Sequence, residues 1–170
     1  MDKIDKVIIK NVSRDGRVSF REIAEQVGIS HVAIKKRFDK LLKDERIKIG
    51  CMRNVKNCKL KYYWVYLSVV NKKELMKQVH NCDKIIDIMD TYGEFDIGLL
   101  FGVTNYSTID CVLDKCIKLD KNNIKKRMTL PILDMDSGYI ISSSEDKQCD
   151  KKKWCATCEY SKMQKCEGCD

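Results

Sequence analysis

The 170-residue chain has no apolar run near the roughly 20 consecutive residues that a membrane-spanning helix needs. Its first ten residues, MDKIDKVIIK, are too charged for a secretory signal peptide, and no small-residue cleavage site follows them. We therefore expect a soluble, cytoplasmic protein with no membrane partner. Apolar residues still make up 44% of the chain, which is enough to build a core and argues against wholesale disorder.

The sequence is also poor in the residue patterns that indicate catalysis. Its two histidines, His31 and His80, lie far apart and have no recognisable metal or catalytic neighbour. It has no glycine-rich phosphate-binding loop and no pattern of a catalytic triad. Its single proline, Pro131, falls in an expected strand and predicts an edge or a bulge there. These absences predict that the chain is not an enzyme.

Positive charge is concentrated in the first third of the chain. Residues 1–60 hold 16 Lys and Arg against 8 Asp and Glu, whereas residues 61–170 hold 17 of each kind. The formal net charge of +8 therefore lies entirely in the first segment. A basic segment of one domain's size favours an anionic partner, most often nucleic acid, and a merely solvated basic surface is the alternative.

The first domain, residues 1–50, has the pattern of three short helices. Ser19, with Glu22 three residues later, has the capping-box pattern at the start of the second helix. Gly28 is placed to end that helix, and Ser30 is a suitable N-cap for the third. A glycine-containing turn before the last of three helices predicts a helix-turn-helix.

The expected third helix, residues 31–44, has two chemically different faces. At about 100° per residue, its apolar side chains fall on one narrow face: Ile34, Phe38 and Leu41. Basic residues fall nearly opposite: Lys36, Lys40 and Lys43, flanked by His31 and Lys35. The apolar stripe would dock on the first two helices, and the lysines would meet phosphates or, near the helix start, base edges. An ordinary solvated helix has the same two faces, so this pattern alone does not decide.

Residues 61–141 change to alternating strand and helix patterns. The run YYWVYLSVV, residues 62–70, is rich in aromatic and β-branched residues and predicts a buried strand. Together with the patterns that follow, it gives the βαββαβ order of a ferredoxin-like unit, so the predicted fold class is α+β. Residues 51–60 are interpreted as a linker that could itself be extended. The apolar run is too large to leave one sheet face in water, which predicts a dimer through this domain.

Three segments of the first domain closely resemble one family: IDKVII, DGRVSF and EIAEQVGIS, which begin at Ile4, Asp15 and Glu22. They are similar to the DNA-binding domain of the Lrp/AsnC family of transcription regulators, whose pattern ends on an arginine that is Arg37 here. The resemblance implies a sequence-specific transcription regulator whose third helix enters the major groove of double-stranded DNA. With the lysine face, it points to these DNA-binding residues: Ser30, His31, Val32, Lys35, Lys36 and Lys40.

Residues 61–141 resemble the second domain of the same family, which senses small molecules and dimerises. Residues 92–96, Tyr-Gly-Glu-Phe-Asp, are similar to its Gly-x-Tyr/Phe-Asp turn. By this resemblance, Gly93, Phe95 and Asp96 would bind a small-molecule effector, whose identity the sequence does not indicate. The resemblance also implies a homodimer or a higher homo-oligomer.

The last segment, residues 142–170, begins as a polar linker and ends in a cysteine cluster that most members of this family lack. Five cysteines fall within its last 22 residues: Cys149, Cys155, Cys158, Cys166 and Cys169. Two Cys-x2-Cys pairs so close together predict one tetrahedral metal site, with Cys149 as a replacement ligand. Both Zn2+ and a [4Fe-4S] cluster stay open as the cofactor. Such a tail would make the regulator metal- or redox-responsive.

Alternatives for the cysteines stay open as well. The tail could be disordered with free thiols. A Cys-x2-Cys pair could instead serve a thiol–disulfide redox protein, although no thioredoxin-like βαβ pattern surrounds either pair. Three cysteines outside the tail are interpreted as buried structural residues: Cys82, Cys111 and Cys116.

Overall fold

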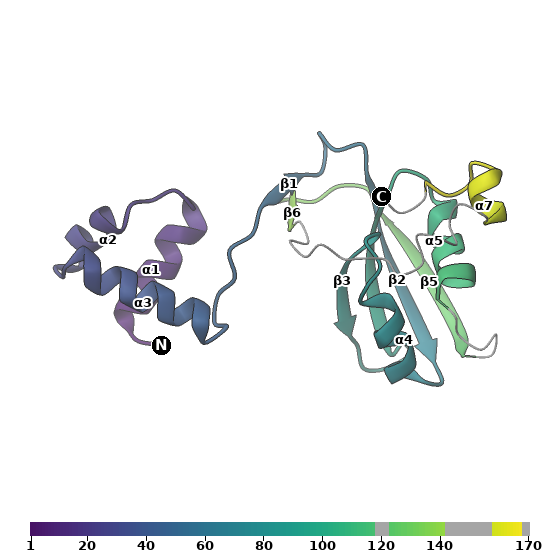
Figure 1. Cartoon of the computed structure of the whole chain (residues 1–170), viewed down its shortest axis with the longest axis horizontal. Coiled ribbons are helices and arrows are strands. Elements are labelled where there is room, and N and C mark those ends of the chain that lie inside the picture. Colours follow the sequence, from purple (N-terminus) through teal and green to yellow (C-terminus); the bar gives the residue numbers. More distant parts are fainter. Residues whose placement is uncertain (118–122, 142–157, 168–170) are drawn as a thin grey trace. The chain divides into compact units, whose positions relative to one another are not determined.

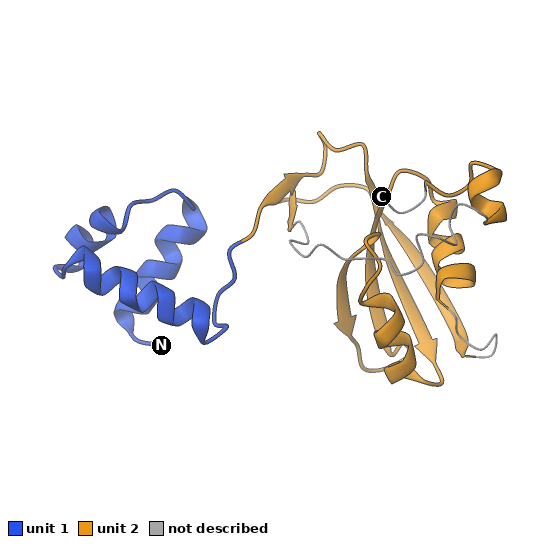
Figure 2. Ribbon diagram, in the orientation of Figure 1, with its two compact units in different colours: residues 1–49 blue, residues 50–170 orange. Residues whose placement is uncertain are grey.

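The computed structural model describes residues 1–117, 123–141 and 158–167. The chain divides into two compact units, unit 1 (residues 1–49) and unit 2 (residues 50–170), shown in Figure 2. Three predicted metal ligands lie outside the described residues: Cys149, Cys155 and Cys169. Within the described ranges, no helix combines the length and the apolar character that crossing a membrane requires.

Unit 1 consists of three helices: α1 (Lys3–Arg14), α2 (Phe20–Val27) and α3 (His31–Lys43) (Figure 1). The hydroxyls of Ser19 and Ser30 cap α2 and α3, each accepting a backbone N–H three residues later at 3.2 Å. At the start of α1, Asp2 and Asp5 form a reciprocal capping box, whereas the cap at α2 is the Ser19 hydroxyl. Gly28 ends α2 with φ 73°, a left-handed conformation that favours glycine.

The core of unit 1 lies between its three helices. Its buried residues are Ile8, Ile23, Ala24, Ile34, Phe38 and Leu41. The last three form the apolar stripe that the sequence predicted for α3, and the structure confirms it. Since this stripe docks on α1 and α2, the opposite face of α3 is turned outward.

Unit 2 is built on a four-stranded antiparallel sheet with the order β3-β4-β2-β5. Its elements are β2 (Lys61–Val69), α4 (Lys72–Val79), β3 (Ile85–Asp90), β4 (Ile97–Val103), α5 (Ser107–Cys111), η1 (Val112–Cys116) and β5 (Ile124–Ile132). The predicted βαββαβ order is confirmed. Pro131 lies in β5, which is an edge strand of this sheet, as the missing N–H donor of proline requires.

The second helical segment of unit 2 is not a regular α-helix. Its apolar residues over 109–117 have the spacing of one α-helix, but α5 passes directly into η1, a π-helical turn. The Ile117 N–H donates to the Val112 carbonyl at 2.8 Å, which is the five-residue hydrogen bond of a π turn. This wider turn changes which side chains share a face.

A second, two-stranded sheet lies in the stretch that was interpreted as a linker. β1 (Met52–Asn54) pairs with β6 (Tyr139–Ile141) in antiparallel register. The pairing buries Ile140, which packs beside Tyr62 and Leu100. Residues 51–60 therefore contain an element of unit 2.

The two faces of the larger sheet are different. Helices α4 and α5 cover one face, over a core that includes Val65, Leu99 and Phe101 (Figure 1). On the other face, Trp64 and Tyr66 stack with ring centroids 6.0 Å apart. Alongside them, apolar side chains of β5 stay open to solvent: Met128 is 37% exposed and Leu130 is 45% exposed. We call this surface of Trp64, Tyr66, Met128 and Leu130 the open face.

Candidate nucleic-acid interface

The six residues predicted to bind DNA lie on the outer side of α3 and at its start. Each of them is exposed: Ser30, His31, Val32, Lys35, Lys36 and Lys40. The Ser30 hydroxyl accepts the Ala33 N–H at 3.2 Å, which leaves its own proton free to donate to a phosphate or a base. Val32 is 49% exposed. Its apolar side chain is of the kind that contacts thymine methyl groups in the major groove.

The charge of α3 suits a polyanion. The helix carries four lysines and Arg37 against one acid, Asp39. The lysines project from the exposed side, so their positive potentials add along one surface. Lysine ammonium groups in such a row contact phosphates and set the register of a helix on DNA without reading bases.

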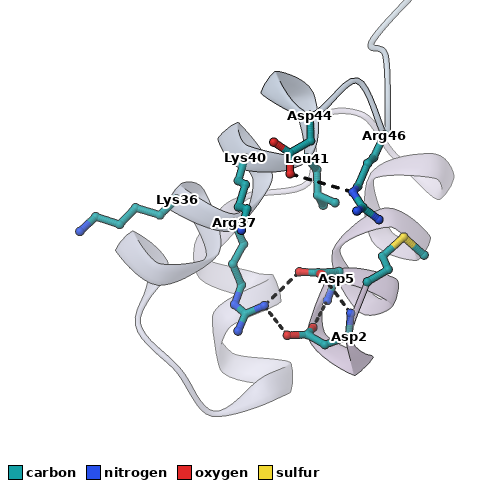
Figure 3. Close-up of a pocket in the computed structure, with 9 residues that line it drawn as sticks. Asp2, Asp5, Lys36, Arg37, Lys40, Leu41, Asp44 and Arg46 are labelled. Carbon is teal, nitrogen blue, oxygen red and sulfur yellow. Dashed lines mark hydrogen bonds and ion pairs between the residues drawn. The ribbon is translucent and has the colours of Figure 1, made fainter.

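Arg37 has a different task from the lysines around it. Its Nη1 atom lies 2.5 Å from Asp2 Oδ2 and 3.0 Å from Asp5 Oδ1, so it ties α3 to the start of α1 (Figure 3). The N–H of Asp5 and the Arg37 guanidinium lower the pKa of Asp2, and the two carboxylates raise the pKa of Arg37. The sequence pattern placed Arg37 at a family position but did not indicate these partners, which lie more than 30 residues away.

A hollow of about 550 Å3 opens beside these ion pairs, between the start of α1 and the second half of α3. Its lining mixes both charges, with Asp44 4.0 Å from Arg46, and with Asp2 and Asp5 both held by Arg37. In Figure 3, Lys36 extends away from the ion pairs. The hollow thus borders the ion pairs that tie α3 to the start of α1, and Lys36 is also one of its lining residues.

The three residues predicted to bind an effector lie together in the turn between β3 and β4. The Asp96 carboxylate accepts the Val69 N–H at 2.8 Å and the Ser68 hydroxyl at 3.1 Å, and these bonds lower the pKa of Asp96. The Phe95 ring lies 6.0 Å from the Tyr66 ring, and Gly93 has φ 124°. Asp96 thus ties the turn to β2, while effector binding by this turn stays a prediction.

Two of the predicted metal ligands, Cys158 and Cys166, lie in the described segment 158–167, which contains the short helix α7 (Glu159–Lys162). The Cys158 Sγ lies 3.9 Å from the Sγ of Cys111 on α5. Sequence reasoning missed this neighbour, because it interpreted Cys111 as a structural core residue. Across the ranges the structure describes, no three His, Cys, Asp or Glu side chains are already arranged around one metal position.

Known proteins share both the sequence pattern and this fold. Residues 1–42 match the AsnC-type helix-turn-helix domain. The HTH-type transcriptional regulator LrpA of Pyrococcus horikoshii is 30% identical over 96 residues, which are 56% of this chain and 62% of LrpA. The chain thus matches less than two thirds of the length of LrpA. The HTH-type transcriptional regulator PF2053 of Pyrococcus furiosus is 30% identical over 114 residues, which are 66% of this chain and 72% of that protein.

The fold has a counterpart among solved structures. The transcriptional regulator NMB0573 of Neisseria meningitidis, solved as a complex with L-Met, has a TM-score of 0.62 at 14% identity. The likeness covers 88% of this chain and 95% of that one. The matched helix-turn-helix domain, the relatives and the shared fold agree with the motifs of unit 1. The chain belongs to the Lrp/AsnC family of transcription regulators.

Proposed function

We propose that this chain is a sequence-specific DNA-binding transcription regulator of the cytoplasm, with α3 as its recognition helix. The observation that carries the proposal is the division of α3 into two faces. Ile34, Phe38 and Leu41 are buried in the core of unit 1, while the lysines between them are exposed. A helix held on one side by a core and lined with cations on the other fits into a DNA major groove.

The start of α3 would contact bases, and its later turns would contact phosphates. Ser30, His31 and Val32 precede or open the helix, where HTH recognition helices contact base edges. Lys36 and Lys40 lie one and two turns further, at a suitable spacing for phosphates. Lys35 lies beside them. Sequence specificity would therefore come from the first group and most of the affinity from the lysines.

The experiment is a gel-shift titration of the full chain on fragments selected from a random duplex library. We expect Lys36→Glu to weaken binding at least about tenfold and to lower the salt dependence of the affinity, since one phosphate contact is lost. The matched control is Lys77→Glu, which reverses an exposed lysine on α4 of unit 2. Equal affinities for the parent and Lys36→Glu would remove this face of α3 from the interface.

The proposal includes a dimer formed through the open face of unit 2. Trp64 and Tyr66 lie over Gly98, where a Cβ atom would meet the Tyr66 ring at 3.2 Å, so the rings lie flat and close to the sheet. A flat aromatic surface with exposed Met128 and Leu130 at its side is costly in water and suits burial against a second copy. Two copies would also present two recognition helices to the two halves of a pseudo-palindromic operator.

A small-molecule effector is the second part of the proposal, and the Neisseria regulator solved with L-Met supports it. Free amino acids are the class to test, starting with L-methionine. We expect the ligand to raise the melting temperature of the parent, because it binds the folded state only. Phe95→Ala should abolish this shift, whereas Met89→Ala, on the neighbouring strand β3, should not. The absence of a shift with every common amino acid would contradict this part.

Metal or redox responsiveness is the third part of the proposal. Cys158 of the tail lies 3.9 Å from Cys111 of α5, so a metal bound by the tail could alter the rest of unit 2. A thiol–disulfide enzyme that uses one of the tail Cys-x2-Cys pairs is less well supported, because no thioredoxin-like βαβ pattern surrounds either pair. The test compares the DNA affinity of the metal-loaded and metal-free chain. Equal affinities would remove the sensing role.

A further inference from the structure

The described part of the tail is docked on the rest of unit 2 by several polar contacts. The Thr104 N–H donates to the Glu167 carboxylate at 2.9 Å, and the Ser107 hydroxyl donates to the Lys165 carbonyl at 2.5 Å. The Glu167 carboxylate also lies 3.7 Å from the ammonium of Lys84. These contacts hold the segment 158–167 across the start of α5, beside which α7 lies in Figure 1.

This docking gathers cysteines from two distant parts of the sequence. Cys111 is only 2% exposed, and Cys116, Cys158 and Cys166 are half-buried around it. The Cys158 Sγ lies 3.9 Å from the Cys111 Sγ, and the Cys166 thiol is in hydrogen-bonding contact with Cys111. Cys111 is thus the centre of the group, although no three of these described thiols are yet arranged around one metal position.

The π turn explains how two of these cysteines come from one helix. Residues five apart lie about 140° apart around an α-helix, which would direct Cys111 and Cys116 to different sides. η1 spans the residues between them, and its five-residue hydrogen bond turns position 116 back toward the side of position 111. π turns are rare and occur often at functional sites.

We propose that Cys111 and Cys116 of the α5–η1 segment, with Cys158 and Cys166 of the tail, bind one Zn2+ ion. This deepens the metal-responsive part of the proposed function, and it replaces two ligands of the sequence prediction, Cys155 and Cys169. The ion would join the tail to the α5–η1 segment by coordination bonds. Lys115 and Lys165, which precede two of the ligands in sequence, offset part of the negative charge of a zinc tetrathiolate.

The distance between the sulfur atoms favours one ion. With Zn–S bonds of about 2.3 Å, the edge of a tetrahedral site is about 3.8 Å. The Sγ atoms of Cys111 and Cys158 are 3.9 Å apart. A disulfide would need about 2.05 Å. In a [4Fe-4S] cluster each thiolate binds a different iron atom, so the cluster itself separates the sulfurs. Zinc binding would draw Cys116 and Cys166 inward, replacing thiol protons by the metal.

The experiment measures zinc bound to the full-length chain, purified under reducing conditions, stripped with a chelator and titrated with Zn2+. We expect one zinc ion per chain. Cys111→Ser and Cys158→Ser should each weaken zinc binding by more than the about 10–100-fold that loss of an outer-shell partner costs. Cys51→Ser is the matched control, since it removes an exposed thiol outside the group. The double variant Cys155→Ser/Cys169→Ser should bind zinc as the parent does.

Because Cys111→Ser could disturb the core, a second variant and two spectroscopic measurements accompany it. Cys158→Ser changes only the tail, and circular dichroism verifies the fold of each variant. With Co2+ in place of Zn2+, both variants should lose part of the thiolate-to-metal charge-transfer absorption.

A parent without zinc, or a Cys111→Ser variant that binds zinc as tightly as the parent, would overturn the proposal. A zinc-free parent whose measured mass is lower by two hydrogen atoms would also overturn it, because that loss indicates a disulfide. Gel shifts on the same samples report DNA binding separately, so either proposal can fail while the other stands.

Discussion

Units 1 and 2 both bury compact apolar cores, but they expose opposite chemistry. Unit 1 covers its core with charge, and α3 presents a row of lysines to solvent. Unit 2 leaves apolar side chains of its sheet exposed, with Leu130 at 45%, and keeps a group of thiols beside α5. The first surface suits a polyanion and the second suits a copy of itself. Each partner can therefore be removed by a substitution that leaves the other interaction intact.

We expect Ile34→Ala in unit 1 to give the largest effect, with DNA binding lost and the oligomer retained. Ile34 is fully buried, and its truncation should cost about 2–5 kcal/mol. A unit of 49 residues has little stability in reserve, so α3 should lose its position and DNA binding should fall below detection. Light scattering should still show the oligomer of the parent.

Leu99→Ala in the core of unit 2 is the reciprocal variant, because Leu99 is equally buried. We expect this variant to destabilise the oligomer more than it disturbs the fold of unit 1. If Ile34→Ala bound DNA like the parent, the assignment of DNA binding to unit 1 would be wrong.

Leu130→Glu should give the next largest effect, on the oligomer. Leu130 lies opposite Trp64 in the β2–β5 register, so the change places a charge in the middle of the open face. We expect self-association to weaken by about 2 kcal/mol or more, the scale of a disrupted hot spot. The control is Leu133→Glu, at a residue 91% exposed just beyond β5. Equal association by both variants, measured by analytical ultracentrifugation, would place the interface elsewhere.

Asp96→Ala should have a smaller effect that stays within unit 2. The change removes the acceptor of the Val69 N–H and the Ser68 hydroxyl, so the turn between β3 and β4 should loosen. We expect a lower urea midpoint for unit 2 and an unchanged salt dependence of DNA binding. Ser68→Ala removes one of the two bonds and should give part of the shift. An unchanged midpoint for both variants would show that the turn does not depend on Asp96.

The smallest expected effect is on the stability of unit 1 at low pH, through the carboxylate of Asp2. Hydrogen bonding from the Asp5 N–H and the nearby Arg37 lower the pKa of Asp2 below 3.8, so folding favours its charged form. This contribution is fully present above pH 3.8 and is lost as the pH falls through the lowered pKa of the folded state. Asp2→Asn keeps a capping side chain and should therefore melt lower than the parent only at the higher pH. A difference that persists in strong acid would point to the cap rather than the charge.

Local patterns were sufficient for most elements of both units. The 3.6-residue spacing of Ile34, Phe38 and Leu41 predicted the buried face of α3, because one helix determines which side chains share a side. The β-branched and aromatic run of β2 predicted a buried strand, because these residue types pack well on a sheet surface. Gly28 and Ser30 marked helix ends through backbone chemistry that involves only neighbouring residues.

Contacts between distant segments could not be predicted in this way. The three-residue strands β1 and β6 are too short to carry a period, and they pair across more than 80 residues. Arg37 finds Asp2 only when α1 and α3 pack together. Cys111 was interpreted as a buried structural residue because free cysteines are most often buried, and nothing near it in sequence indicates a thiol that is 47 residues away.

The π turn also bears on how the helix that carries these thiols tolerates a change of length. A π turn contains one residue more than the α turn that it replaces. Insertion of a single residue between Cys111 and Cys116 into an ordinary helix would therefore produce η1, while the flanking strands β4 and β5 keep their places in the sheet. A regulator could therefore accept an extra residue between two cysteines of one helix without redesigning its core. Deletion of Asp114 should restore an α turn with the cysteines four residues apart, about 40° around the helix, so the two thiols would share a face in either form.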